Sequence, residues 1–205
     1  MIKVKDKEIT NIEKNLMTEG SIWKTILIFS IPLILGNLLQ QTYNTIDSMI
    51  VGNFVGSNAL AAVGSSTALI NLLISFAQGI AVGSGIILAQ SLGSNARKDV
   101  KVSIHTSLAL ALVLGISISI LGYIFAPWFL EKMQTPSEVM PESIQYLRTF
   151  SLGLVFNVIY NMEAGILNAV GNSKRSLLYL FIASATNIVL DFLFIKNFAM
   201  GVRGA

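Results

Sequence analysis

Three acidic side chains lie inside long apolar segments of this sequence: Asp47, Glu163 and Asp191. An ionisable group in a membrane-spanning helix costs at least roughly 2.5–3.5 kcal/mol on insertion scales, so each is a functional candidate. Asn187 precedes Asp191 by four residues, which places both side chains on one face of a helix. Carboxylate and amide oxygens suit a hard cation, and two carboxylates at similar depth can share a proton or a sodium ion.

We therefore predict that Asp47, Asn187 and Asp191 form a cation-coupling site, and a Na⁺ ion there is the only metal that we expect. The alternative for either Asp is a side chain that snorkels to the membrane interface. Glu163 is interpreted differently, because it lies about two turns before Lys174 and Arg175 and favours an interfacial ion pair.

Uncharged polar residues form a stripe on the first apolar segment, at spacings of three and four. With a carboxylate at its end, this stripe favours a water-filled cavity over hydrogen bonds between helices, which remain the alternative. The predicted cavity-lining residues are Asn37, Gln40, Gln41, Asn44, Asn157 and Asn161. Pro32 interrupts the same segment and should kink the helix, so it is a candidate hinge, although packing also explains a kink.

The segments that carry these residues predict an all-α, polytopic membrane protein. The chain has 205 residues, of which 53% are hydrophobic and 12% are charged, and no charged residue lies between Asp47 and Arg97. Such a stretch is more than twice the roughly 20 residues that one membrane helix needs. Five spans are expected at about 22–51, 59–92, 102–126, 143–169 and 176–196. Aromatic residues near their ends predict interfacial anchors: Trp23, Tyr123, Trp128, Tyr146 and Tyr179.

Lysine and arginine predict the orientation of these spans. They gather before the first span and in the second and fourth connections, whereas the opposite side mixes basic and acidic residues. We therefore expect a multi-pass protein of the cell membrane, with a cytoplasmic tail at 1–21 and a transmembrane lobe at 22–205. Residues 200–205 are typical of a loop that leads into another helix, so the lobe is expected to stop before helix six.

Several functions are excluded by composition. The chain has no cysteine and one histidine, and its net charge of +3 is dispersed, which argues against thiol chemistry, a catalytic histidine and nucleic-acid binding. We expect neither catalytic residues nor a cofactor, only a coupling ion.

Five groups of short motifs occur in order after Gly20. They are Ile31-Pro32 with Gln40 to Asp47; Val51-Gly52 with Ala59 to Gly64; Gly79 to Gly85 with Leu92-Gly93; Ala164 to Leu167 with Gly171-Asn172-Ser173; and Asn187 to Asp191. The ordered set resembles the multidrug and toxic compound extrusion (MATE) family. This resemblance implies a twelve-helix transporter of two six-helix lobes, in which this chain is most of the amino-terminal lobe.

The resemblance also implies a function. It is H⁺- or Na⁺-coupled efflux of small organic, mainly cationic, drugs or toxic compounds by alternating access. Asp47 matches the acid of the first helix, and Asn187 and Asp191 match the polar pair of the fifth; a further hydroxyl ligand of some members lies beyond Ala205. Glu163 replaces an expected small or neutral residue, which leaves a chain-specific salt bridge or an altered substrate preference open.

The expected partners are a small-molecule substrate, the lipid bilayer and the missing carboxy-terminal lobe, from the same gene product or a second copy. Three alternatives remain open. The first is a flippase for lipid-linked oligosaccharides, whose cavity should be cationic. The second is an intramembrane aspartyl protease, because two Asp on separate helices can form a dyad, but the Gly-x-Gly-Asp setting is absent. The third is a lobe without activity of its own.

Overall fold

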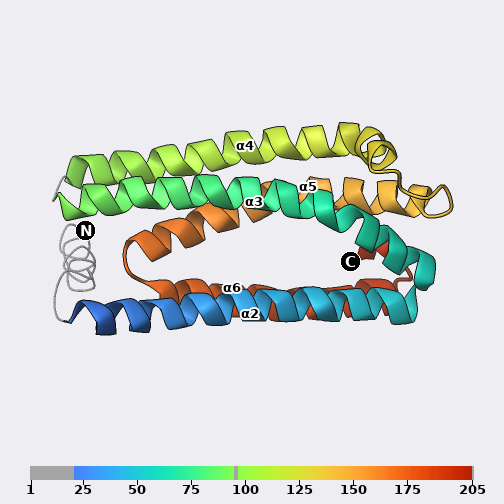
Figure 1. Ribbon diagram of the computed structural model, residues 1–205, viewed down its shortest axis with the longest axis horizontal. Helices are drawn as coiled ribbons and strands as arrows, with labels where there is room; N and C mark the ends of the chain where they lie inside the picture. The colour runs from blue at the N-terminus through green and yellow to red at the C-terminus, as the bar shows by residue number, and fades with distance from the viewer. Residues whose placement is uncertain (1–20, 95–96, 205) are drawn as a thin grey trace.

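The structure is a computed structural model that describes residues 21–94 and 97–204, and the part it describes is all helical (Figure 1). The long helices are α2 (Ile22–Phe54), α3 (Ser57–Gly93), α4 (Arg97–Lys132), α5 (Met140–Ala169) and α6 (Ser173–Phe192). A π-helix, η1 (Leu193–Asn197), and a 3₁₀ helix, η2 (Gly201–Gly204), follow α6. In the described residues, five helical segments are long and apolar enough to cross a membrane. The predicted fold class and the five spans are confirmed; the tail at 1–21, apart from Ser21, lies outside the described residues.

The boundary of the third span was predicted wrongly, because α4 continues through Pro127 to Lys132. Proline has no backbone N–H, so the carbonyl of Tyr123, four residues earlier, loses its helical partner. Arg148 of α5 replaces that partner: its Nε donates to the Tyr123 carbonyl oxygen at 3.3 Å. The Arg148 guanidinium also lies 5.2 Å from the centre of the Tyr123 ring. Helix α4 therefore continues past Pro127, because a side chain of the neighbouring helix supplies the hydrogen-bond donor that the proline lacks.

A double-mutant cycle should reveal this replacement. Arg148→Ala should lower the free energy of unfolding by about 1–2 kcal/mol, because it leaves the Tyr123 carbonyl without a donor. In a Pro127→Ala background the loss should be smaller, since an alanine at this position supplies its own backbone N–H. Unfolding in detergent measures both costs, and equal costs in the two backgrounds would contradict this account of α4.

The helices form two groups (Figure 1). In one, α3, α4 and α5 pack together; in the other, α2 packs along α6. The last helix of the first group, α5, leans toward α6 and joins it through a turn at 170–172, where Gly171 has φ +77°. The side chain of Asn172 caps α6 by accepting from the Arg175 backbone N–H at 3.4 Å. The first and the last long helices are thus spatial neighbours.

Small residues allow α3 and α5 to approach each other closely. A Cβ atom added to Gly165 would lie 2.8 Å from the carbonyl oxygen of Ala81, and one added to Gly85 would lie 3.2 Å from the carbonyl oxygen of Gly165. Helices in membranes associate largely through such close packing, because burial of apolar surface provides little drive there. This crossing fixes the tilt of α5 against α3.

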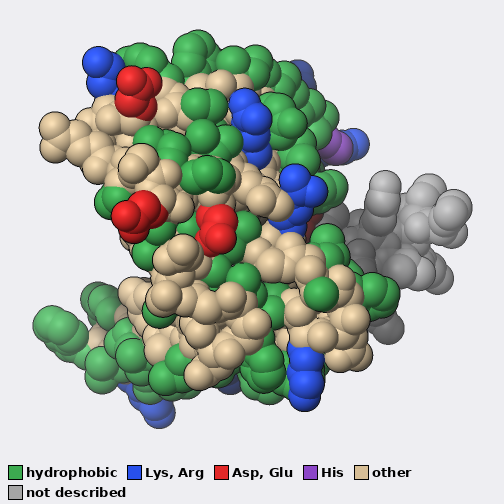
Figure 2. Space-filling view, turned by 90° about the vertical axis from the view of Figure 1, so that its right-hand side faces the viewer, with side chains coloured by type: hydrophobic (Ala, Val, Ile, Leu, Met, Phe, Trp, Pro, Cys, Tyr) green, Lys and Arg blue, Asp and Glu red, His purple; other side chains and the backbone are tan. Residues whose placement is uncertain are grey.

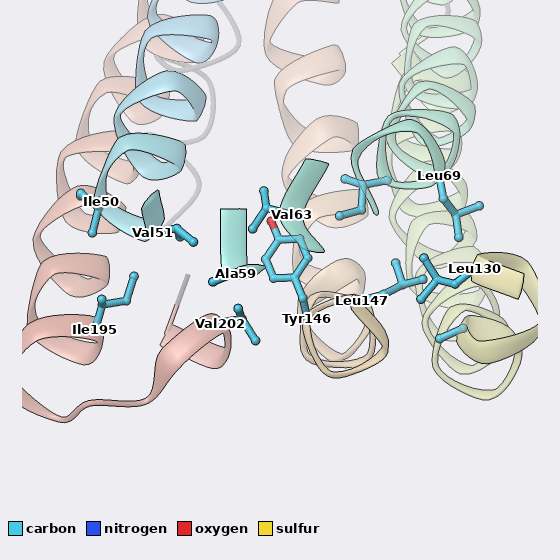
Figure 3. Packing of buried hydrophobic residues seen from close by; sticks show 12 residues of the cluster. Ile50, Val51, Ala59, Val63, Leu69, Leu130, Tyr146, Leu147, Ile195 and Val202 are labelled. Atoms are coloured by element: carbon cyan, nitrogen blue, oxygen red, sulfur yellow. The ribbon is translucent and has the colours of Figure 1, made fainter. Parts of the chain in front are cut away.

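We call the end of the lobe that holds the 133–139 connection and residues 193–204 the distal end, and the opposite end the proximal end. The distal end has a core that draws on all seven elements (Figure 3). The other buried cluster involves α3, α4 and α5 alone: Ala77, Ala81, Ala111, Val158 and Met162. The two helix groups are therefore joined by a common core at the distal end.

Charged residues differ between the two ends. The described helix ends on the proximal side carry Lys24, Lys98, Lys101, Lys174 and Arg175, with Asp99 as an acidic neighbour. The distal end, seen in Figure 2, mixes acidic and basic side chains. In the described residues, the basic side chains of the second and fourth connections lie at the same end of the lobe as Lys24, whereas the lysines of the tail before Ser21 lie outside the described residues. The orientation of that end toward the cytosol stays a prediction.

Candidate functional site

Asp47 and Asp191 meet because α2 and α6 run parallel and in register. The hydroxyl of Ser173, at the start of α6, donates to the carbonyl oxygen of Phe29 in α2 at 3.2 Å. Asp47 and Asp191 each lie 18 residues beyond this contact, a rise of about 27 Å in both helices. The two acids, expected at similar depth, lie at the same level along the paired helices, and their carboxyl groups lie within hydrogen-bonding reach of each other.

Asn187 completes the cluster from the preceding turn of α6. Its Nδ2 donates to Asp191 Oδ1 at 3.4 Å. Asp191 is only 3% exposed, and Asp47 is half-buried. The sequence analysis therefore selected three residues that the fold does bring together.

This cluster contains three buried oxygen atoms without a hydrogen-bond donor: Asp47 Oδ1, Asn187 Oδ1 and Asp191 Oδ2. Buried polar atoms without partners are rare in folded proteins and need an explanation. Two carboxylates and an amide oxygen match the ligands that hard cations prefer, and they equally match a shared proton. In the described part of the chain, no three His, Cys, Asp or Glu residues cluster as metal ligands. The oxygen atoms of this cluster therefore fit a shared proton and also fit a cation such as Na⁺.

Tyr146 belongs to this site although the sequence analysis placed it at the membrane interface. That prediction is wrong, because Tyr146 is 7% exposed and lies beside Ala59, Val63 and Val202 in the distal core (Figure 3). It is close enough to both Asp47 and Asp191 to interact with their charges. A signal was available: Ser143, Leu147 and Ser151 are spaced by four, Tyr146 follows Ser143 by three, and all four are buried on one face of α5.

Aromatic contacts hold α2 and α6 together just beyond the acids. The rings of Phe54 and Phe192 meet edge to face with centroids 5.6 Å apart. Lys196 Nζ lies 4.7 Å from the centre of the Phe192 ring and 5.7 Å from that of Phe54. Lys196 belongs to the π-helix η1, which begins two residues after Asp191. Such π-helical turns are often found at functional sites.

The predicted cavity-lining residues fall into two sets. On α2, Asn37, Gln41 and Asn44 are exposed and Gln40 is half-buried. On α5, Asn161 Nδ2 donates to Asn157 Oδ1 at 2.8 Å, so these two amides bond each other. Both amides belong to α5, so this bond lies within one helix and leaves the cavity and the hydrogen bonds between helices both open for the pair. A cavity along the α2 stripe stays a prediction.

Pro32 is buried, and α2 runs continuously through it, so its role as a hinge also stays a prediction. Glu163 is exposed and lines a small cavity between α5 and α6. The ion pair expected between Glu163 and Lys174 or Arg175 is absent from the described residues.

Comparison with known proteins agrees with this architecture. The family model MatE matches residues 32–193. The chain is 33% identical over 188 residues to the "Probable multidrug resistance protein YpnP" of Bacillus subtilis, covering 92% of this chain and 42% of that protein. It is 34% identical over 173 residues to the "Probable multidrug resistance protein YoeA" of the same organism, covering 84% and 37%.

A solved structure described as MATE in the bent conformation superimposes with a TM-score of 0.85 at 31% identity, covering 93% of this chain and 42% of that one. The chain therefore spans about two-fifths of the length of the relatives that it matches. Its fold is one lobe of their architecture. Members of the matched family are transporters and not enzymes, which removes the protease alternative. The described residues contain five apolar helices, and the MatE family model matches most of the length of the chain. The chain therefore belongs to the multidrug and toxic compound extrusion family of membrane transporters.

Proposed function

We propose that the chain forms the amino-terminal lobe of a cation-coupled antiporter that exports small organic cations. The observation that carries this proposal is the cluster of Asp47, Asn187 and Asp191, with three buried oxygen atoms that lack donors. Relatives named multidrug resistance proteins support drugs as the exported compounds. The protein would lie in the cell membrane with its proximal end toward the cytosol, and the second lobe would come from the same gene product or a second copy.

The coupling step follows from electrostatics between α2 and α6. Two ionised carboxylates within hydrogen-bonding reach repel each other strongly where water is scarce. A proton or Na⁺ bound between them removes this repulsion and lets the distal part of α2 stay against α6. Release of the ion favours an arrangement in which the two acids separate. The ion thereby shifts the balance between inward- and outward-facing states, and substrate binding in the cavity between lobes shifts it back.

The coupling ion should stabilise the purified full-length protein. Either Na⁺ replacing K⁺ at constant ionic strength, or a change from about pH 8 to about pH 6, should raise Tm, because the ion binds only the folded arrangement. A rise of about 1 °C is expected for each kcal/mol of binding free energy in a protein of more than twice this length. Thermal unfolding in detergent measures the shift, and the condition that produces it identifies the ion.

Asp191→Asn serves as the control for this measurement, because it removes one carboxylate and retains the shape of the side chain. The shift should vanish in this variant. A Tm that responds to neither ion, or that responds equally in Asp191→Asn, would contradict the assignment of the site.

A further inference from the structure

A second polar site lies far from the acid pair, where α5 converges on α6 near the proximal end. A cavity of about 120 Å³ opens there between Tyr160, Glu163, Ala164, Leu167, Ser176 and Tyr179. We call this cavity the tyrosine wedge. One water needs roughly 10–15 Å³ of such space, so the wedge can hold a small organic group.

The lining follows from helical spacing on both helices. Tyr160 and Glu163 are three residues apart on α5, and Ser176 and Tyr179 are three apart on α6. Side chains at this spacing share a face, so each helix presents two polar side chains to the same wedge. Ala164 and Leu167 provide the apolar part of the α5 wall.

Glu163 is the only acidic residue that lines the wedge. It lies six residues before Ala169, the last residue of α5, which places it about 9 Å from that end of the helix. Lys174 and Arg175 follow at the start of α6, yet the described residues contain no ion pair between them and Glu163. The carboxylate is therefore available to a positive charge that enters the wedge.

A carboxylate combined with aromatic rings is a set of groups that recognises substituted ammonium ions. The faces of Tyr rings attract such cations, and the attraction grows when water is excluded. Glu163 supplies the full charge, Tyr160 and Tyr179 supply rings, and the Ser176 hydroxyl supplies a hydrogen-bond partner. The Glu163 carboxylate would repel an anionic ligand, so the wedge favours cations.

We infer that the tyrosine wedge binds the ammonium group of an organic cation before export, as a receiving site separate from the coupling site. Tyr146, beside the acid pair, is 17 residues from Glu163 along α5, about 25 Å. The two sites therefore lie near opposite ends of the lobe. This inference rests on the proposed export function, because it identifies the wedge ligand with the exported substrate class.

Equilibrium binding of radiolabelled tetraethylammonium to the purified full-length protein tests the site. Glu163→Gln should weaken binding about tenfold, because it removes the charge and retains the size of the side chain. Tyr179→Leu should weaken it about fivefold, whereas Tyr179→Phe, which keeps the ring, should bind like the wild type. Glu138→Gln is the matched control, because Glu138 is an exposed carboxylate of the distal connection.

The outcomes separate this inference from the proposed function. Wild-type protein that does not bind tetraethylammonium, or Glu163→Gln that binds it as tightly as Glu138→Gln, overturns the wedge as a cation site. Binding that depends on Glu163 and persists in Asp47→Asn supports it, because the coupling site is distant. Glu163-dependent binding combined with normal ion-driven export by Asp47→Asn would leave the wedge in place and overturn the proposed coupling.

Discussion

Asp47→Asn and Asp191→Asn should each abolish ion-driven export by the full-length transporter, while the amount of folded protein in the membrane stays near the wild-type level. Asparagine keeps the shape of aspartate and its oxygen acceptor, but it carries no charge and cannot release a proton. With one carboxylate left, the repulsion that drives α2 away from α6 is absent in every state. The protein should then lose the response to the ion and keep its fold, because the change removes a buried charge from an apolar setting.

Export from membrane vesicles under an imposed pH or Na⁺ gradient measures this effect. Glu138→Gln should behave as the wild type, because Glu138 is exposed in the distal connection and belongs to neither α2 nor α6. Normal gradient-driven export by either aspartate variant would refute the coupling role of the pair. Loss of the folded protein itself would show that the acids serve stability instead.

Gly165→Val should disrupt the lobe itself. A Cβ at residue 165 would lie 2.8 Å from the Ala81 carbonyl oxygen, which is backbone and cannot rotate away. Helix α5 must then separate from α3, and the loss of packing should lower stability by about 2–3 kcal/mol. The measurement is the fraction of monodisperse protein after extraction in detergent, together with its Tm.

Gly153→Val provides a matched control within the same helix, because a Cβ at residue 153 meets no atom within 4 Å. Both variants lose the same glycine flexibility and gain the same β-branched side chain, so only the α3–α5 contact differs between them. Equal loss of folded protein in the two variants would show that helix propensity, and not the close crossing, is responsible.

Much of the architecture was accessible from local patterns. The apolar segments predicted five helices because a membrane helix satisfies its own backbone, so span length alone identifies it. Polar side chains in such segments cost free energy on insertion into the membrane. For this reason the sequence analysis could select Asp47, Asn187 and Asp191. Their contact could be expected from equal depth, which depends only on rise per residue and on the side from which each helix starts.

The features that escaped prediction all depend on a second helix. Tyr146 looks like an interfacial aromatic until α3 and η2 are placed around it. Pro127 predicts the end of a helix unless Arg148 of the neighbouring helix is known to bond the Tyr123 carbonyl. From the sequence, Glu163 is expected to form an ion pair with the basic residues that follow it. In the structure, α5 leans toward α6, and Glu163 lines the cavity between these helices. Local sequence does not encode these approaches between helices.

The pairing of α2 with α6 has a consequence for synthesis in the membrane. The Ser173–Phe29 contact joins residues 144 positions apart, so α2 must wait for the synthesis of α3, α4, α5 and the start of α6 before it gains this partner. Meanwhile α3, α4 and α5 can pack as each emerges, because their contacts join helices that are adjacent or one helix apart in the chain. During this interval Asp47 lacks the contact with Asp191 of α6 that it has in the folded lobe. We therefore expect α2 to remain at the insertion machinery, or with a chaperone, until Asp191 arrives.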